Sequence, residues 1–142
     1  VVLIMTDSLT LPNDIDTIPQ LNEFIDSFCE RADIDMGTTA SLNLALEEAV
    51  VNVIEYAYPA GTVGDVEIDA MTEGETIKFI LMDSGTPFDP TKKPEIDTTL
   101  SAEERSIGGL GIHLVRQIMD SVNYEYKDGK NVLTLKKIIN KQ

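Results

Sequence analysis

The amino-acid sequence predicts an α+β fold, a two-layer α/β sandwich whose mixed, mainly antiparallel sheet is covered on one face by three helices. Three segments carry apolar residues at helical spacing, and five short apolar segments have strand character. Four of the strand segments are joined in pairs by short turns, so they are expected to pair antiparallel. Each helical segment has one apolar stripe, which places the helices on the same side of the sheet.

The first part of the chain is expected to form a strand, a loop and a helix. Residues 1–6 are apolar enough for a buried or edge strand, and residues 9–15 are predicted to form a loop because they contain a Pro-Asn-Asp run. Thr17 and Gln20 have the spacing of a capping box, which predicts a helix start. Apolar residues then recur at helical spacing until about Asp33.

The clearest helical pattern covers residues 37–57. Its apolar stripe consists of Leu42, Ala45, Leu46, Ala49, Val50, Val53, Ile54 and Ala57. Strands are predicted at 66–71, where apolar and charged residues alternate, and at 77–82, which is almost continuously apolar. A hairpin turn at residues 73–75 is expected to join them.

A third helix is predicted at residues 110–120, entered through a glycine cluster, with strands at 122–126 and 132–135 after it. The Asp128-Gly129 pair between these strands is typical of a type I′ hairpin. Residues 86–106 have three prolines, many charges and no periodicity. We expect them to form a long functional loop, a lid.

The composition indicates one domain, residues 1–142, with a single core. The net charge of −14 argues against binding to nucleic acid or to anionic membranes, because both need patches of Lys and Arg. No apolar run reaches the ~18 residues of a membrane span. The lone Cys29 lies in an apolar helical pattern and is expected to be a buried, inert thiol. These features favour a cytoplasmic protein.

Glu48 and Asn52 form the first motif with chemical potential. Four residues separate them, so they lie one above the other on one face of the second helix. An amide oxygen is a suitable ligand for a hard cation such as Mg²⁺, and a carboxylate can orient or deprotonate a hydroxyl group. The alternative is an ordinary solvated helix face, since Glu47 and Glu55 are close by.

Asp83 and Gly85 belong to the second motif, Asp-Ser-Gly-Thr-Pro-Phe-Asp-Pro, which follows the most apolar strand. A carboxylate at a strand end can accept a hydrogen bond from an exocyclic amine such as that of adenine. A glycine lets the backbone approach a flat ligand closely. The alternative is a simple strand-end turn, for which Asp-Ser-Gly is also well suited.

The third motif is Gly108-Gly109-Leu110-Gly111, before the third helix. Glycines allow consecutive N–H groups to converge on a phosphate, and the helix N-terminus adds a partial positive charge. Arg105 is the nearest cation and is a candidate to bind a terminal phosphate. The motif is not a P-loop, because no Gly-Lys-Ser/Thr follows. A flexible hinge is the alternative.

Together the three motifs predict an ATP site that uses Mg²⁺. The only histidine, His113, has no cysteine or carboxylate at ligand spacing and is expected to be a packing or surface residue.

The order and spacing of these motifs resemble those of the bacterial anti-sigma factor serine/threonine protein kinases. The likeness covers nearly the whole chain and is strongest at residues 46–52, 83–90 and 109–115. These kinases belong to the GHKL superfamily of histidine-kinase-like ATPases. The resemblance therefore implies the Bergerat-type ATP-binding fold of that superfamily.

The resemblance also implies roles for individual residues. Asn52 would bind Mg²⁺ and Glu48 would be the catalytic base. Asp83, helped by Gly85, would read the adenine amino group. The phosphates would be bound by the backbone of Gly108, Gly109, Leu110 and Gly111, with Arg105 at the terminal phosphate.

Two positions depart from the pattern of the family. Asn131 stands where many members have a threonine that helps to hold adenine, and an asparagine can also donate and accept hydrogen bonds. Arg105 lies four residues before Gly109, farther than in sporulation-type kinases.

In the family, the substrate is a serine or threonine of a small anti-anti-sigma protein of the STAS type, and the kinase also sequesters a sigma factor. Members often form homodimers. The leading hypothesis is therefore a Mg-ATP-dependent protein serine/threonine kinase that acts as an anti-sigma factor. The alternative is a regulatory interaction module without catalysis, which binds ATP or no nucleotide. A sensor histidine kinase is disfavoured because the chain has no phosphoacceptor of its own.

Overall fold

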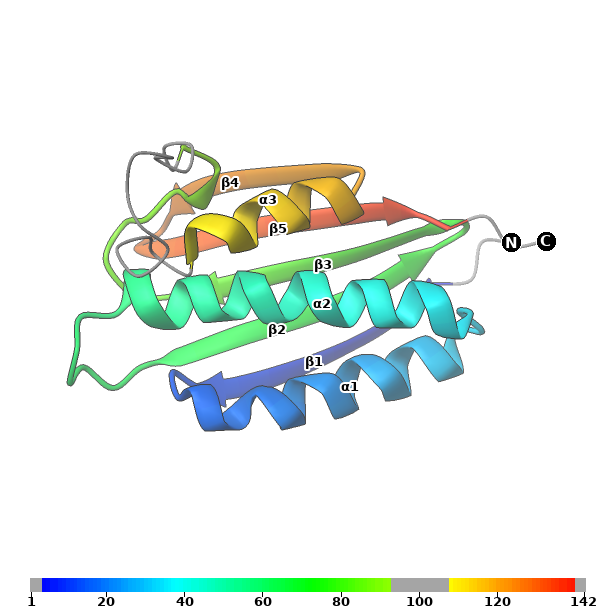
Figure 1. Cartoon of the computed structure of the whole chain (residues 1–142), viewed down its shortest axis with the longest axis horizontal. Helices are drawn as coiled ribbons and strands as arrows, with labels where there is room; N and C mark the ends of the chain where they lie inside the picture. The colour runs from blue at the N-terminus through cyan, green and yellow to red at the C-terminus, as the bar shows by residue number, and fades with distance from the viewer. Residues whose placement is uncertain (1–3, 93–107, 140–142) are drawn as a thin grey trace.

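The structure is a computed structural model that describes residues 4–92 and 108–139. The principal elements follow the predicted order β-α-α-β-β-α-β-β (Figure 1). They are β1 (Ile4–Pro12), α1 (Ile18–Arg31), α2 (Met36–Asn52), β2 (Asp65–Glu73), β3 (Thr76–Asp83), α3 (Gly108–Ile118), β4 (Ser121–Lys127) and β5 (Lys130–Ile138).

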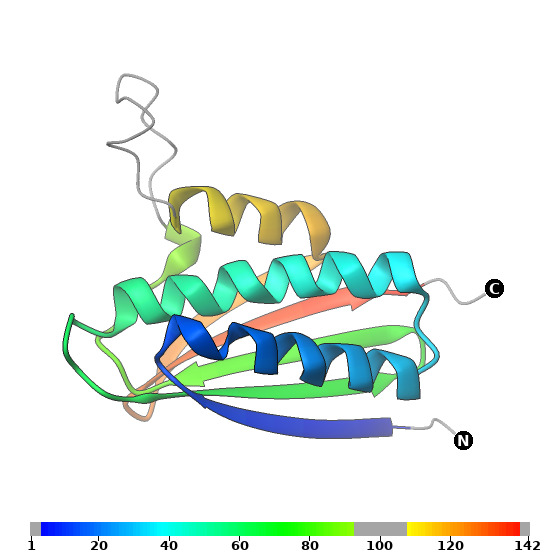
Figure 2. The ribbon, with the colours of Figure 1, turned by 60° about the horizontal axis from the view of Figure 1, so that its bottom comes forward.

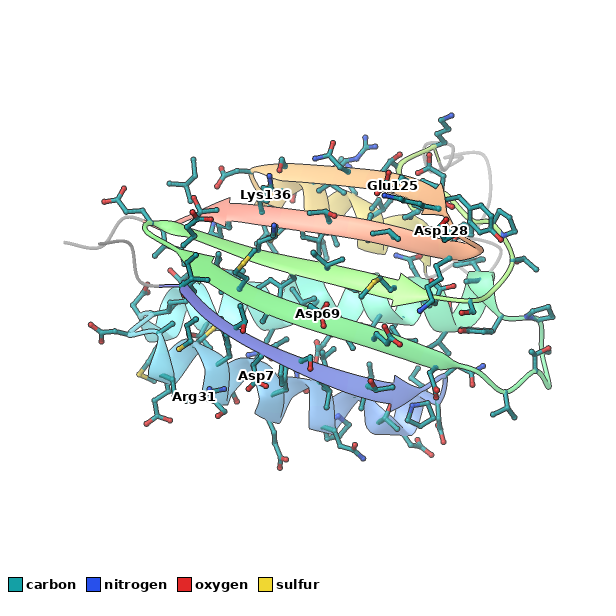
Figure 3. All side chains as sticks on the ribbon, turned by 180° about the vertical axis from the view of Figure 1, so that it is seen from behind. Asp7, Arg31, Asp69, Glu125, Asp128 and Lys136 are labelled. Carbon is teal, nitrogen blue, oxygen red and sulfur yellow. The ribbon has the colours of Figure 1, made fainter. Side chains whose placement is uncertain are left out.

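The five strands form one sheet in the order β1-β2-β3-β5-β4. All four pairings in the described part of the chain are antiparallel, whereas a mixed sheet was expected. The three helices lie on one side of the sheet, as predicted, and the described residues place no helix on the other side (Figures 2 and 3). Asp69 and Lys136 mark this uncovered side in Figure 3.

The first strand is longer than predicted. Residues 9–12 were assigned to a loop, but β1 pairs with β2 from Ile4 to Pro12. Leu11 is buried against the core. Pro12 is tolerated because it is the last residue of an edge strand, where its missing N–H breaks no internal pairing.

The predicted capping box at Thr17 is wrong. The Thr17 hydroxyl donates to the Asp14 carbonyl oxygen at 2.6 Å, and its side chain makes no capping bond to α1. A 3-10 turn, Ile15–Thr17, precedes the helix and is itself capped by the Asp14 carboxylate. The helix therefore begins directly after a separately capped 3-10 turn.

The second helical prediction, residues 37–57, is α2 followed by a π-helical turn, Val53–Ala57. Its apolar stripe is buried between the helices and the sheet, apart from the partly buried Ile54. Cys29 is also buried, and burial raises the pKa of its thiol, in agreement with the prediction. The core therefore lies between the two layers.

The hairpin between β4 and β5 has the predicted geometry. Asp128 and Gly129 have φ values of 55° and 78°, the left-handed values that a type I′ turn requires. The third helix begins at Gly108 rather than at Leu110, so the glycine cluster forms its first turn. None of the described helices is long and apolar enough to cross a membrane.

Candidate functional site

The sequence motifs meet at one end of the two layers. The C-terminal ends of α2 and β3, the start of β5 and the N-terminal end of α3 all lie on the left in Figure 1. Residues at or near these ends, together with residues of the segment after β3 and of β4, line a small, mostly apolar pocket. They are Ala49, Asn52, Val53, Leu81, Asp83, Phe88, Pro90, Ile112, Tyr124, Asn131 and Leu133.

Asn52, the last residue of α2, has an orphaned polar atom in this pocket. Its side chain is almost completely buried, with 2% exposure. Nδ2 donates to the Glu48 carbonyl oxygen at 3.0 Å, but Oδ1 has no partner. A buried acceptor without a partner costs about 1–3 kcal/mol, so it needs an explanation. It suits a cation that accepts oxygen ligands.

Glu48 lies one turn before Asn52 and is half-buried. Burial raises the pKa of its carboxyl group, and the negative charges of Glu47 and Glu55 raise it further. A raised pKa makes a carboxylate a stronger base, as general base catalysis needs. Of the two residues of the first motif, Asn52 lines the pocket, whereas Glu48 lies one helical turn before it and is not among the lining residues.

Asp83 ends β3 and points into the pocket with 5% exposure. Its Oδ1 accepts hydrogen bonds from Gly85 N at 2.9 Å and from Asn131 Nδ2 at 2.9 Å. Burial raises the pKa of Asp83, and these two hydrogen bonds partly offset that effect. The carboxylate is thus firmly oriented at the pocket wall.

The segment after β3, residues 84–92, is hydrogen-bonded to the π-helical turn that follows α2. The Ala57 carbonyl oxygen accepts from Thr86 N at 2.7 Å and from the Thr86 hydroxyl at 3.0 Å. Tyr58 OH accepts from Ser84 N at 3.1 Å and donates to the Asp65 carbonyl oxygen at 2.7 Å. Hydrogen bonds therefore join the second motif to residues 57 and 58, at the end of the π-helical turn.

Asn131 faces Asp83 across the β3–β5 pairing and is the centre of a polar network. Nδ2 donates to Asp83 Oδ1 and to the Thr86 carbonyl oxygen, both at 2.9 Å. Oδ1 accepts from Phe88 N at 2.9 Å and from Tyr124 OH. The network joins three pocket walls: the end of β3, the segment after it and β4.

The pocket has a narrow interior, with about 20 Å³ available to water-sized molecules. That is room for roughly one water molecule. A purine ring would therefore fit only if the walls of the pocket moved outward. Phe88 and Pro90 form the outer wall, and Phe88 stacks on Tyr56 with ring centroids 5.4 Å apart.

The third motif is described only in part. Gly108, Gly109, Leu110 and Gly111 form the first turn of α3, where helix N–H groups have no intrahelical partner. Ile112, directly after them, lines the pocket. Arg105 and most of the expected lid fall in residues 93–107, outside the described part of the chain. His113 is exposed, as expected.

Sequence reasoning missed Tyr124 and Phe88 as pocket residues. Tyr124 could have been placed on the helix-covered face from the alternation of Val122, Tyr124 and Tyr126. That alternation does not indicate which of the three meets the pocket. Arg116 was also missed: its Nη2 donates to the Thr91 carbonyl oxygen at 2.6 Å and joins α3 to the segment beside the pocket.

The chain matches a known protein family over most of its length. The family described as "Histidine kinase-like ATPase domain" matches residues 11–137. The chain belongs to this family. The serine-protein kinase RsbW of Listeria monocytogenes is 30% identical over 122 residues, which are 83% of this chain and 78% of that kinase.

A second relative is the serine/threonine-protein kinase BtrW of Bordetella bronchiseptica. It is 27% identical over 95 residues, 67% of each chain. These relatives confirm the resemblance to the anti-sigma factor kinases and the expected enzyme class, a protein serine/threonine kinase.

A solved structure supports the fold of this family member. The RsbU and RsbW domains of a Mycobacterium tuberculosis protein superpose with a TM-score of 0.70 at 14% identity. The match covers 97% of this chain and 33% of that one. At this identity the comparison concerns the fold alone, and it confirms the α+β architecture.

Proposed function

We propose that this protein is a Mg-ATP-dependent protein serine/threonine kinase that acts as an anti-sigma factor. The observation that carries the proposal is the buried Asn52 Oδ1, which has no hydrogen-bond partner and lines the same pocket as Asp83. An ATPase family member with an unsatisfied oxygen at that position has a ready ligand for a divalent cation.

The donor set near Asn52 fits Mg²⁺. The described residues contain no group of three or more His, Cys, Asp or Glu side chains that could hold a metal ion. Mg²⁺ is commonly held by one or two protein oxygens together with substrate phosphates and water. Asn52 Oδ1 would be such a ligand, and the bound ion would neutralise phosphate charge. This neutralisation matters here because the carboxylates of Glu47, Glu48 and Glu55 near Asn52 would repel the phosphates.

The nucleobase specificity is assigned to Asp83. An ionised carboxylate only accepts hydrogen bonds, so it favours the 6-amino group of adenine over the 6-oxo group of guanine. The apolar wall residues Leu81, Ile112 and Leu133 suit the faces of a purine ring. Gly108, Gly109, Leu110, Gly111 and Arg105 are assigned to the phosphates.

Glu48 is assigned to the reacting hydroxyl group. Its raised pKa allows it to accept a hydrogen bond or a proton from the attacking serine or threonine. In phosphoryl transfer most of the rate comes from alignment and charge neutralisation, so Glu48 acts mainly by orienting the hydroxyl group.

The proposed partners are those that the resemblance to the kinase family implies. We propose that the phosphorylated hydroxyl belongs to a STAS-type anti-anti-sigma protein and that the same chain sequesters a sigma factor. A homodimer is also proposed, and light scattering of the purified protein would test it. We also propose that the chain itself does not bind nucleic acid directly and does not bind a membrane.

Calorimetric titration with ATP, with and without Mg²⁺, tests the site. The native protein should bind ATP more tightly with Mg²⁺, and Asn52→Ala should lose that gain. Asn43→Ala on the same helix is the matched control, because its amide lies outside the pocket and bonds Asp26. An equal response to Mg²⁺ in Asn52→Ala would contradict the metal assignment.

Transfer of the γ-phosphate from labelled ATP to a STAS-type protein tests catalysis. Glu48→Gln should bind ATP but transfer phosphate at a rate at least about a hundred times lower. Glu47→Gln should retain transfer. ATP binding without transfer in the native protein would contradict the kinase proposal and favour the alternative, a non-catalytic sequestering module.

A further inference from the structure

The Asn131 side chain has no hydrogen-bonding capacity left for a ligand. An asparagine amide has two donor hydrogens on Nδ2 and two acceptor positions on Oδ1. Nδ2 uses both donors, on Asp83 Oδ1 and the Thr86 carbonyl oxygen. Oδ1 uses both acceptor positions, for Phe88 N and Tyr124 OH. The side chain is also buried, with 4% exposure.

The backbone partners determine which way the amide points. Phe88 N–H can only donate, so it must meet Oδ1, and the Thr86 carbonyl can only accept, so it must meet Nδ2. Both bonds are 2.9 Å long. In a flipped amide, Nδ2 would face the Phe88 N–H, so two donors would meet. Oδ1 would face the Thr86 carbonyl oxygen, so two acceptors would meet. The Asn131 donor therefore faces Asp83.

This donor selects one oxygen of Asp83. Among the described residues, the hydrogen bonds to the Asp83 carboxylate, from Asn131 and from Gly85 N, both end on Oδ1. Oδ2 is thereby the oxygen left to accept from a ligand. The same amide holds Thr86 and Phe88, so the carboxylate and the pocket wall beside it share one anchor.

We infer that Asn131 is a positioning residue for nucleobase selection: it does not contact the base but orients Asp83 so that Oδ2 accepts from an exocyclic amine. This inference rests on the proposed ATP-binding function. It differs from the expectation that Asn131 itself holds adenine, because direct contact would break one of four existing hydrogen bonds. The selected ligand class is a purine nucleotide with a 6-amino group.

The test compares Mg-ATP with the Mg complex of purine riboside triphosphate, which lacks the 6-amino group but keeps the ring nitrogens and phosphates. Calorimetry measures both dissociation constants for each variant. The native protein should prefer ATP by about tenfold or more, because a hydrogen bond to a charged group is lost with the analogue.

Asn131→Ala should reduce this preference to less than about threefold, with the loss confined to ATP. Asn131→Thr retains one donor and should give an intermediate preference. Asn123→Ala, on the exposed face of β4, is the matched control and should keep the native ratio. Partial unfolding lowers the affinity for both ligands equally and leaves the ratio of the two dissociation constants unchanged. This ratio therefore separates a positioning role of Asn131 from a general structural role.

Two results would overturn the inference. One is an unchanged ratio in folded Asn131→Ala or Asn131→Thr, including the case in which the affinities for both ligands fall by the same factor. The other is a native protein that binds both ligands equally well. If the native protein binds neither ligand, the proposed function fails, and this inference fails with it.

Discussion

Gly85 lies directly against Ala57, and the contact leaves no room for a side chain. A Cβ atom on Gly85 would be 2.4 Å from the Ala57 carbonyl oxygen. That oxygen already accepts two hydrogen bonds from Thr86. The end of α2 and the segment after β3 are therefore held at one fixed distance. Gly85 was expected to allow close approach of a ligand, and the structure shows that it allows close approach of the chain to itself.

Gly85→Ala should destabilise the protein by about 1–3 kcal/mol, as expected for overpacking against backbone atoms. It should also weaken ATP binding, because Asp83 accepts from Gly85 N. Urea unfolding and calorimetry measure the two effects. Gly37→Ala is the control: its Cβ would meet only a side-chain oxygen of Asp35, at 3.3 Å, and no backbone atom. Equal stabilities of the two variants would contradict the steric argument.

Asn52→Ala should leave the stability of the nucleotide-free protein within about 1 kcal/mol of native, although the residue is buried. The substitution removes an acceptor whose burial without a partner costs about 1–3 kcal/mol. Leu46→Ala, at a fully buried position on the same helix, should cost about 2–5 kcal/mol. Urea unfolding compares them. A loss in Asn52→Ala as large as that in Leu46→Ala would show that Oδ1 is satisfied within the protein.

Asp83→Asn should make the protein more stable at neutral pH while abolishing the preference for ATP. The pKa of Asp83 is raised by burial, so the folded state binds its proton more tightly than the unfolded state does. The contribution of Asp83 to the free energy of unfolding is fully present below the pKa of this group in the unfolded state, about 3.9. It is lost as pH rises through the higher pKa of the group in the folded state.

Urea unfolding from about pH 4 to pH 8 tests this linkage. The difference in unfolding free energy between Asp83→Asn and native should grow with pH and then level off above the raised pKa. A difference that stays constant with pH would contradict the raised pKa. The new amide can still accept from Asn131 and Gly85, so the local hydrogen bonds are kept.

The pH profile of phosphate transfer should report the environment of Glu48. Its carboxyl group must be ionised to act as a base, and its pKa is raised first by burial and then by Glu47 and Glu55. On the acid side of the profile, the acid limb, the transfer rate should therefore fall at a higher pH than it would with an ordinary glutamate as the base. Glu47→Gln should move this limb to lower pH, because it removes a repelling negative charge.

Glu47→Gln is a conservative change because its side-chain oxygen can still accept from Asn22 Nδ2, a bond of 3.0 Å in the structure. Glu30→Gln, on the exposed face of α1, is the control and should leave the profile unchanged. An acid limb that stays in place in Glu47→Gln would mean that another group controls it.

Tyr58→Phe should destabilise the protein by about 1–3 kcal/mol, because the hydroxyl group joins Ser84 N to the Asp65 carbonyl oxygen. The ring remains, so its packing against Gly64 is kept. Tyr126→Phe, in which the exposed ring is retained, should cost little. Unfolding free energies measure both changes, and similar values for the two would contradict the role assigned to the Tyr58 hydroxyl.

Much of the fold could be predicted because its signals are local. The apolar stripe of α2 repeats every turn, and the left-handed residues Asp128 and Gly129 are adjacent in the chain. The extension of β1 to Pro12 could not be predicted in this way. It depends on pairing with Asp65, a residue far along the chain, and that pairing outweighs the local preference for a turn.

The candidate site divides in the same way. The shared helix face of Glu48 and Asn52 could be predicted from their spacing alone, since helical geometry places residues four apart together. The contacts of Asn131 with Asp83 and of Gly85 with Ala57 became known only from the structure, because strand register and loop packing join residues that are distant in sequence. Spacing within one element follows backbone geometry, whereas contacts between elements follow the packing of the whole core.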